Sequence, residues 1–170
     1  MALISARLKF RRLSLSDYGN MCALESDPEV IRHTPHRFPI PPEKIKERLA
    51  NMVSKESEYA PLGIWVAETH AADFVGWFMI LKRALPFPEL GFMILRRHWG
   101  QGYTTEACHA LINYAFEDLQ LPGLSAVTDS GNTPSINVLT KVGFKLVSES
   151  EGFDSALNKT TPKKHFELKR

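Results

Sequence analysis

The chain has 170 residues, of which 44% are hydrophobic, and a formal net charge of +2. This length supports one well-buried core and is short for two ordinary domains, so we expect a single domain over residues 1–170. A charge so close to balance gives no reason to expect a nucleic acid or an anionic membrane as a partner.

The two cysteines and the start of the chain bear on the compartment. Cys22 and Cys108 both fall on predicted helices, which favours buried free thiols in a reducing compartment. Residues 1–10 lack the long apolar core of a secretion signal, and the longest apolar stretches have the length of strands. We therefore expect a cytoplasmic protein.

The first half of the chain predicts a strand, two helices and a hairpin. In chain order these are a strand over 3–13, a helix over 14–26, a helix over 43–55, and two antiparallel strands over 63–69 and 73–82. The proline-rich passage 32–42 cannot be helical, because proline lacks a backbone donor and restricts the residue before it.

The second half alternates strands with helices, which predicts an α/β fold with a mixed sheet. The predicted elements are a strand over 89–95, a helix with a buried stripe over 107–119, a strand over 124–129, a short helix over 132–143, and two final strands over 143–148 and 163–169. Residues 151–162 are rich in small and polar side chains, so we expect a mobile loop between the last two strands.

Two glycines join the strand over 89–95 to the long helix. Gly100 and Gly102 can adopt backbone angles that other residues avoid, and they let a ligand approach the main chain closely. The unpaired amides of the first helical turn and the positive end of the helix dipole then face an anion. Arg96 and Arg97 add positive charge beside this turn. The pattern predicts a pyrophosphate site, although a Gly-x-Gly alone also fits a purely structural corner.

A second motif, Asn-Thr-Pro-Ser-Ile-Asn-Val-Leu-Thr-Lys-Val-Gly-Phe, occupies residues 132–144. Asn132 or Thr133 can cap a short helix here, Pro134 suits its start, and Gly143 can end it. Together with Trp-Gly-Gln-Gly-Tyr-Thr-Thr-Glu-Ala over 99–107, this motif resembles the GCN5-related N-acetyltransferases, and within them the RimJ/RimL-like branch. The resemblance is specific over about 89–144 and implies a central sheet with a bulged, splayed pair of strands flanked by helices.

The resemblance implies acetyl-CoA as cosubstrate and a primary amine as acceptor, either the N-terminal α-amine of a peptide or a small-molecule amine. The amides of residues 101–104 are the implied pyrophosphate donors, and the strand before the turn is implied to pair with the pantetheine arm through its backbone. Asn132 is implied to bind the pantetheine amide, or else only to cap its helix. The cofactor-binding residues implied in this way are Phe92, Met93, Ile94, Trp99, Gly100, Gln101, Gly102, Tyr103, Thr104 and Asn132.

Two positions in this turn depart from the general family pattern and resemble the RimL-like variant. Trp99 stands where a long polar side chain is usual, and Thr104 stands where a small residue is usual. A frame that starts at Arg97 also matches the glycine pattern by letter, but it moves the Thr-Glu-Ala segment out of register.

The implied reaction is direct attack of the amine on the thioester, and it needs a base because a free amine is largely protonated at pH 7. Family members often use a carboxylate near the start of the strand before the turn, which is Glu89 here; Asp129 and water are the alternatives. Many relatives protonate the departing thiolate with a tyrosine whose position is Leu139 in this chain. The RimL-like branch implies Ser135 as the acid instead, unless Ser135 only caps the helix.

The missing tyrosine keeps a second function class open, a noncatalytic acyl-CoA-binding sensor with the same fold. With no Cys-x-x-Cys and no His-x-x-x-His, we predict that no metal is bound. We expect acceptor specificity to reside in residues 32–57, where His33 and His36 border the site. Neither the acceptor nor the oligomeric state can be inferred from the sequence.

Overall fold

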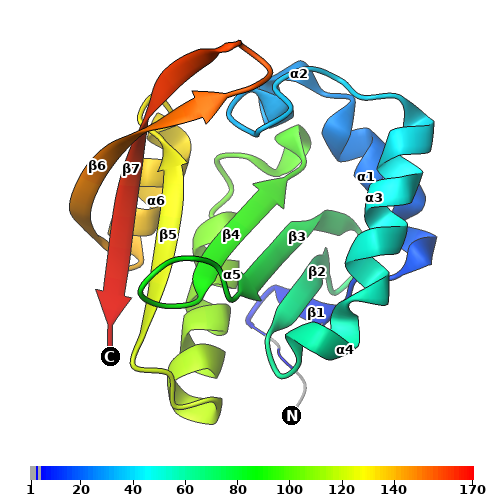
Figure 1. Cartoon of the computed structure of the whole chain (residues 1–170). Helices are drawn as coiled ribbons and strands as arrows, with labels where there is room; N and C mark the ends of the chain where they lie inside the picture. The colour runs from blue at the N-terminus through cyan, green and yellow to red at the C-terminus, as the bar shows by residue number, and fades with distance from the viewer. Residues whose placement is uncertain (1–2, 4) are drawn as a thin grey trace.

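A seven-stranded mixed sheet forms the centre of the computed structural model, which describes residue 3 and residues 5–170 (Figure 1). The strand order across the sheet is β1-β2-β3-β4-β5-β7-β6. The strands are β1 (Leu8–Arg12), β2 (Gly63–Thr69), β3 (Phe74–Leu81), β4 (Glu89–Ile94), β5 (Gly123–Asp129), β6 (Lys145–Asp154) and β7 (Lys159–Lys169).

Helices cover both faces of the sheet. They are α1 (Tyr18–Glu25), α2 (Pro28–Ile31), α3 (Pro42–Ser54), α4 (Glu56–Tyr59), α5 (Tyr103–Asn113) and α6 (Thr133–Lys141), with short turns η1 (Leu15–Asp17), η2 (Arg96–His98) and η3 (Tyr114–Asp118). Among the helices of the described residues, none combines the length and the apolar character that a membrane crossing requires.

The hydrophobic core has two layers, one on each face of the sheet. The predicted stripe of α5, with Ala107, Cys108 and Leu111, packs against one face. Apolar residues of α1 and α3, including Leu24 and Leu49, pack against the other face. Side chains alternate between the two faces along a strand, so the layer that a β4 side chain joins identifies the face on which it lies.

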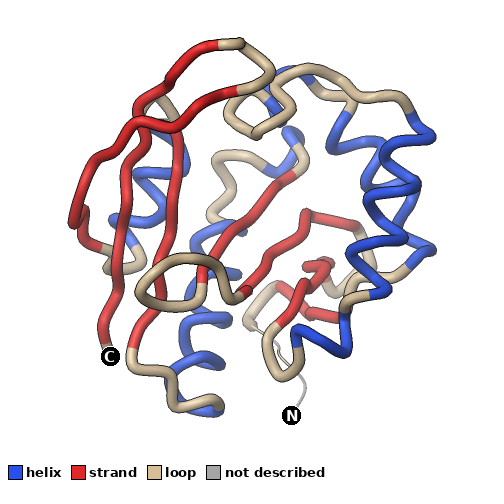
Figure 2. Tube along the Cα trace, in the orientation of Figure 1, coloured by secondary structure: helices blue, strands red, loops and turns tan. Residues whose placement is uncertain are grey.

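The parallel strands β4 and β5 touch at one register position and then separate. β4 pairs with β3 along its whole length, whereas β4 and β5 pair only where Glu89 lies opposite Ser125. Figure 2 shows the two strands diverging from this point toward their carboxyl ends. The predicted splayed pair is therefore present. Because the register between β3 and β4 is unbroken, β4 stays beside β3, and the gap opens between β4 and β5.

Helix α6 ends where its sequence predicts. The Asn132 side chain accepts a hydrogen bond from the Ser135 amide at 3.3 Å, so Asn132 is the cap and Thr133 is the first helical residue. Gly143 has a φ of 98°, and the amides of Gly143 and Phe144 donate to the last carbonyls of the helix. The left-handed glycine thus satisfies the helix end and returns the chain to the sheet.

Two sequence expectations were wrong in their bounds. The first strand begins at Leu8 rather than at residue 3, and residues 1, 2 and 4 lie outside the described part of the chain. Residues 151–162 are not a loop, because residues 151–154 pair with 159–162 as the end of the β6–β7 hairpin. Most of β6 is exposed on an edge of the sheet. Residues 151–154 therefore lack the alternating apolar pattern that predicts a strand.

Candidate active site

The turn before α5 has the predicted left-handed glycines. Gly100 has a φ of 72° and Gly102 a φ of 79°, and Gly102 occupies the N-cap position of α5. No side chain caps this helix end. The first amides of α5 have no partner within the helix, so they form an array of donors at the positive end of the helix dipole.

Polar contacts from neighbouring segments hold the turn in place. Asp73, between β2 and β3, pairs with Arg97 at 2.6 Å and lies 3.0 Å from His98 Nε2. The indole N–H of Trp99 donates to the carbonyl of Ile94 at 3.0 Å, and its amide donates to Arg96. Both N–H groups of Trp99 are therefore engaged within the protein, and its side chain ties the turn to the end of β4.

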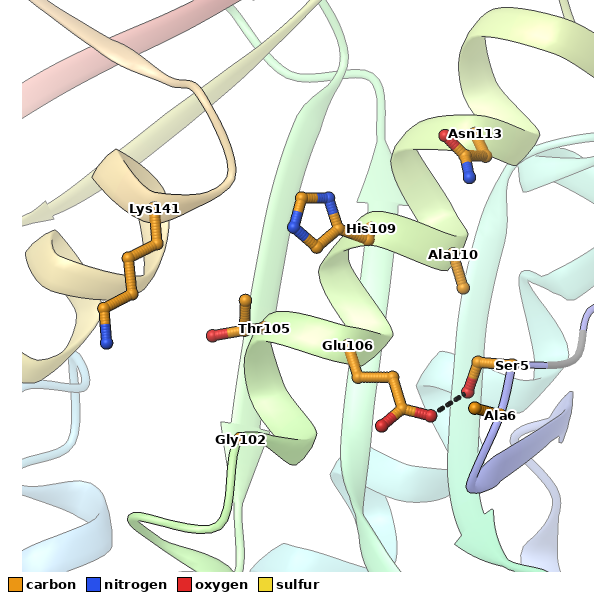
Figure 3. Close-up of a pocket in the computed structure, with 9 residues that line it drawn as sticks. All are labelled: Ser5, Ala6, Gly102, Thr105, Glu106, His109, Ala110, Asn113 and Lys141. Atoms are coloured by element: carbon orange, nitrogen blue, oxygen red, sulfur yellow. Dashed lines mark hydrogen bonds between the residues drawn. The ribbon is translucent and has the colours of Figure 1, made fainter.

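An open groove of about 680 Å³ runs along the outer face of α5 and begins at the turn (Figure 3). It is lined by Ser5, Ala6, Gly102, Thr105, Glu106, His109, Ala110, Asn113 and Lys141. His109 and Lys141 bring imidazole and ammonium groups to the groove from α5 and α6. Sequence reasoning missed all of these residues except Gly102, because only the packing of α5 beside α6 and the N-terminal segment brings them together.

Glu89 lies where β4 and β5 meet. Its neighbours on the same side of β4 are Gly91 and Met93, and Met93 packs with the α1 and α3 layer. Glu89 thus lies on the face opposite α5, with 18% of its side chain exposed. Burial raises the pKa of Glu89, and Arg83, whose Nε is 3.6 Å away, opposes this rise. A carboxylate in this environment is a stronger base than a solvated glutamate.

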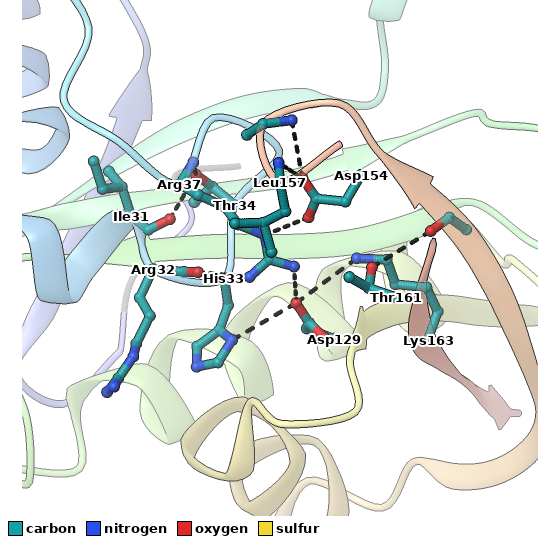
Figure 4. Close-up of polar contacts among 12 residues, drawn as sticks. Ile31, Arg32, His33, Thr34, Arg37, Asp129, Asp154, Leu157, Thr161 and Lys163 are labelled. Carbon is teal, nitrogen blue, oxygen red and sulfur yellow. Dashed lines mark hydrogen bonds and ion pairs between the residues drawn. The ribbon is translucent and has the colours of Figure 1, made fainter. Parts of the chain in front are cut away.

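Asp129, the alternative base, is engaged in an ion-pair network (Figure 4). Arg37, from the loop after α2, donates to Asp129 and to Asp154 at the end of β6. His33 Nδ1 and Lys163 Nζ each lie 3.8 Å from Asp129. Burial tends to raise the pKa of Asp129, but the hydrogen bond from Arg37 and the charges of Lys163 and Arg37 outweigh burial and lower it. These contacts make Asp129 a weaker candidate base than Glu89.

Burial lowers the pKa of both histidines that the sequence places in the acceptor loop, His33 and His36. His33 faces Asp129, and burial lowers its pKa against the attraction of that carboxylate. Burial also lowers the pKa of His36, with a further contribution from the charge of Arg48. Their positions connect the loop over 32–41 with the carboxyl end of β5 and with α3.

Ser135 lies half-buried on the first turn of α6, next to the end of β5. Its amide donates to Asn132, but its hydroxyl makes no hydrogen bond to any described residue. The Ser135 hydroxyl therefore does not cap the helix. Leu139, which replaces the tyrosine of many relatives, is 2% exposed and belongs to the α5 core layer.

Comparison with known proteins identifies the family. The sequence pattern that defines the acetyltransferase (GNAT) domain matches residues 7–145. The chain belongs to the GNAT acetyltransferase family. Within it, the uncharacterized N-acetyltransferase p20 of Bacillus licheniformis is 31% identical over 146 residues, which cover 84% of this chain and 82% of that relative. The protein is an acetyl-CoA-dependent N-acetyltransferase that acts on an amine acceptor.

Solved structures share the GNAT fold along nearly the whole chain. A GNAT-family acetyltransferase from Bacillus anthracis superposes with a TM-score of 0.86 at 19% identity, covering 99% of this chain and 98% of that one. RimL, a ribosomal L7/L12 α-N-protein acetyltransferase solved with coenzyme A, gives 0.84 at 11% identity over 99% and 98%. The ribosomal-protein-S5-alanine acetyltransferase from Vibrio fischeri gives 0.72 at 17% identity over 99% and 96%. At these identities the likeness shows the fold alone.

Proposed function

We propose that this GNAT enzyme transfers the acetyl group of acetyl-CoA to a primary amine by direct attack within a ternary complex. The acceptor is the N-terminal α-amine of a peptide or a small-molecule amine. One observation carries the proposal: β4 and β5 pair only at Glu89 and Ser125. The β4 main chain that faces β5 beyond this point has no strand partner, and it lies between an amide-rich turn and a half-buried carboxylate.

Each part of acetyl-CoA has a complementary set of groups. The amides of residues 101–104 would bind the pyrophosphate. The backbone groups of residues 92–94 that face β5 would pair with the pantetheine arm, and one amide there would polarise the thioester carbonyl. The Ile94 carbonyl already accepts from the Trp99 indole. Asn132 would bind the pantetheine amide without losing its cap, because its Oδ1 has a second lone pair and its Nδ2 carries two donors. The Lys141 ammonium in the groove would supply positive charge for the phosphorylated adenosine.

The proposed chemistry assigns two proton transfers to opposite sides of the thioester. Glu89, directly or through a water molecule, takes a proton from the amine, and the nitrogen lone pair attacks the carbonyl carbon. As the tetrahedral oxyanion collapses and the C–S bond breaks, the nitrogen loses its second proton to solvent. The CoA thiolate takes a proton from the Ser135 hydroxyl, which solvent protonates again. No step uses a metal, so EDTA should leave the rate unchanged.

The test is incubation of the protein with acetyl-CoA and a panel of amines, with detection of released thiol and of the acetylated product by mass spectrometry. Because RimL and the Vibrio fischeri neighbour acetylate ribosomal proteins, as their names state, the panel includes peptides with N-terminal serine or alanine beside polyamines and amino sugars. We expect thiol and acetylated amine in equal amounts with at least one acceptor class. CoA binding with no thiol release from any amine would instead indicate an acyl-CoA sensor.

A further inference from the structure

Glu106 presents an electrostatic difficulty at the proposed diphosphate site. It lies in the first turn of α5 and lines the groove that begins at Gly102. A carboxylate is favourable at a helix N-terminus when no other anion is present. A bound diphosphate, however, would be repelled by an uncompensated negative charge one turn away.

The N-terminal segment compensates this charge. Glu106 accepts hydrogen bonds from Ser5 Oγ at 2.7 Å, from the Arg7 amide at 2.7 Å and from Arg7 Nε at 2.6 Å (Figure 3 shows the Ser5 contact). Burial tends to raise the pKa of Glu106, but these three donors outweigh burial and lower it. Glu106 is therefore an anion at neutral pH, and it is paired with the Arg7 guanidinium.

Arg7 also contacts the turn itself. Its Nη1 donates to the carbonyl of Gln101 at 3.0 Å, and its guanidinium lies 4.4 Å from the centre of the Tyr103 ring. Its Nη2 makes no hydrogen bond within the described residues and lies 3.4 Å from where a Cβ on Gly102 would be. The Arg7 side chain is 47% exposed, and Nη2 is its nitrogen beside the left-handed glycine.

We propose that Arg7 completes the diphosphate site of this enzyme. It neutralises Glu106, it holds the Gln101 carbonyl away from the amide array, and it presents Nη2 to the diphosphate. A planar guanidinium suits this role because it can bind a carboxylate, a carbonyl and a phosphate through different nitrogens at once. The inference rests on the proposed binding of acetyl-CoA at the turn and adds a side chain from the other end of the chain.

The test measures CoA binding by calorimetry and the kinetics of acetyl transfer for Arg7→Gln. We expect the Kd for CoA and the KM for acetyl-CoA to rise by about tenfold or more, since a charge-assisted contact is lost and Glu106 is left unpaired. The rate at saturating acetyl-CoA should change by less than about threefold, because Arg7 is remote from the reacting atoms.

Arg12, at the end of β1, offers a matched control. It pairs with Glu56 at 3.0 Å and lies 4.2 Å from the Trp65 ring, so Arg12→Gln removes an ion pair and a cation–π contact away from the turn. The CoA affinity of Arg12→Gln should equal that of the wild type.

Should Arg7→Gln fail to fold, Arg7→Lys is the second variant. It retains a charge but cannot bridge Glu106 and Gln101, and its Kd for CoA should rise by a smaller factor.

The double variant Arg7→Gln/Glu106→Gln separates charge from packing. It should bind CoA more tightly than Arg7→Gln alone, because the unpaired carboxylate is gone. The role of Arg7 is overturned if Arg7→Gln binds CoA within twofold of the wild type, or if the double variant is no tighter than the single one. Failure of the wild type to bind CoA would instead overturn the proposed function together with this inference.

Discussion

At the scale of single residues, two opposing influences act on the pKa of Glu89. Burial raises it and Arg83 lowers it. If Glu89 is the base, Glu89→Gln should reduce kcat/KM by about a hundredfold at pH 7. The rate should recover as the pH approaches the pKa of the acceptor, because the neutral amine then forms without a base. Steady-state rates from pH 6 to 9 check this, and wild-type rates throughout that range would exclude Glu89.

Arg83→Gln is the companion variant for Glu89. Because the charge of Arg83 opposes the rise in the Glu89 pKa, its removal should raise that pKa further. A carboxyl with a raised pKa becomes protonated at a higher pH, so the acid limb of the rate profile should move to higher pH. An unmoved limb would show that Glu89 does not titrate in catalysis.

The sequence leaves Ser135 open as either a proton donor or a helix cap, and the structure gives the cap to Asn132. Asn132 caps α6, whereas the Ser135 hydroxyl has no partner within the described residues. Asn132→Ala should therefore cost about 1 kcal/mol of stability, and Ser135→Ala should leave the melting temperature nearly unchanged. If Ser135 protonates the thiolate, Ser135→Ala should lower kcat by about a hundredfold with unchanged CoA affinity. Full turnover in Ser135→Ala would eliminate it as the acid.

At the scale of elements, the turn and α5 form the proposed anion-binding unit. Gly102→Asp would place a carboxylate beside the amide array and force a non-glycine residue into a φ of 79°. We expect calorimetry to detect no CoA binding while circular dichroism retains the native spectrum. Gly19→Asp in α1, where an added Cβ meets no atom within 4 Å, introduces the same charge elsewhere and should bind normally. Unchanged affinity in Gly102→Asp would make the turn a structural corner.

At the scale of the whole molecule, Arg37 joins three distant segments. Its side chain, 10% exposed, connects the loop after α2 with the ends of β5 and β6. Arg37→Met would leave Asp129 without its guanidinium, at a cost of about 3 kcal/mol. Arg32→Gln, in the same loop but exposed and paired with Glu29 at 3.4 Å, should cost less than about 0.5 kcal/mol. Urea unfolding measures both, and equal losses would contradict a special role for Arg37.

The stability lost in Arg37→Met should depend on pH in a defined direction. The pKa values of Asp129 and Asp154 are lowered in the folded state, so their pairing stabilises the protein above the unfolded carboxyl pKa of about 3.9. The stabilisation is lost as the pH falls through the lower, folded values. The contribution of the two carboxylates to the difference between wild type and Arg37→Met should thus shrink below about pH 4. Burial lowers the pKa of His33, and the charge of Arg37 lowers it further, so Arg37→Met should make His33 easier to protonate.

Prediction from sequence succeeded where the signal is local. The stripe of α5, the cap at Asn132 and the left-handed glycines at 100, 102 and 143 were all anticipated. Prediction found the first half of β6 but took residues 151–154 for a loop, because an exposed edge strand needs no apolar face and its pairing with β7 supplies the hydrogen bonds. It also left Asp129 open as a base, since the approach of Arg37 could not be foreseen.

The sequence by itself determined the family, the α/β fold and the left-handed turn before α5, because backbone angles, helix caps and core periodicity depend on residues a few positions apart. Only the tertiary structure decided which charges meet. Arg7 contacts Glu106 from 99 positions away, and Arg37 contacts Asp154 from 117 positions away. The sequence does not indicate which partner a charged side chain will meet, because the packing of the strands and helices decides it. These contacts shape both ends of the proposed active site.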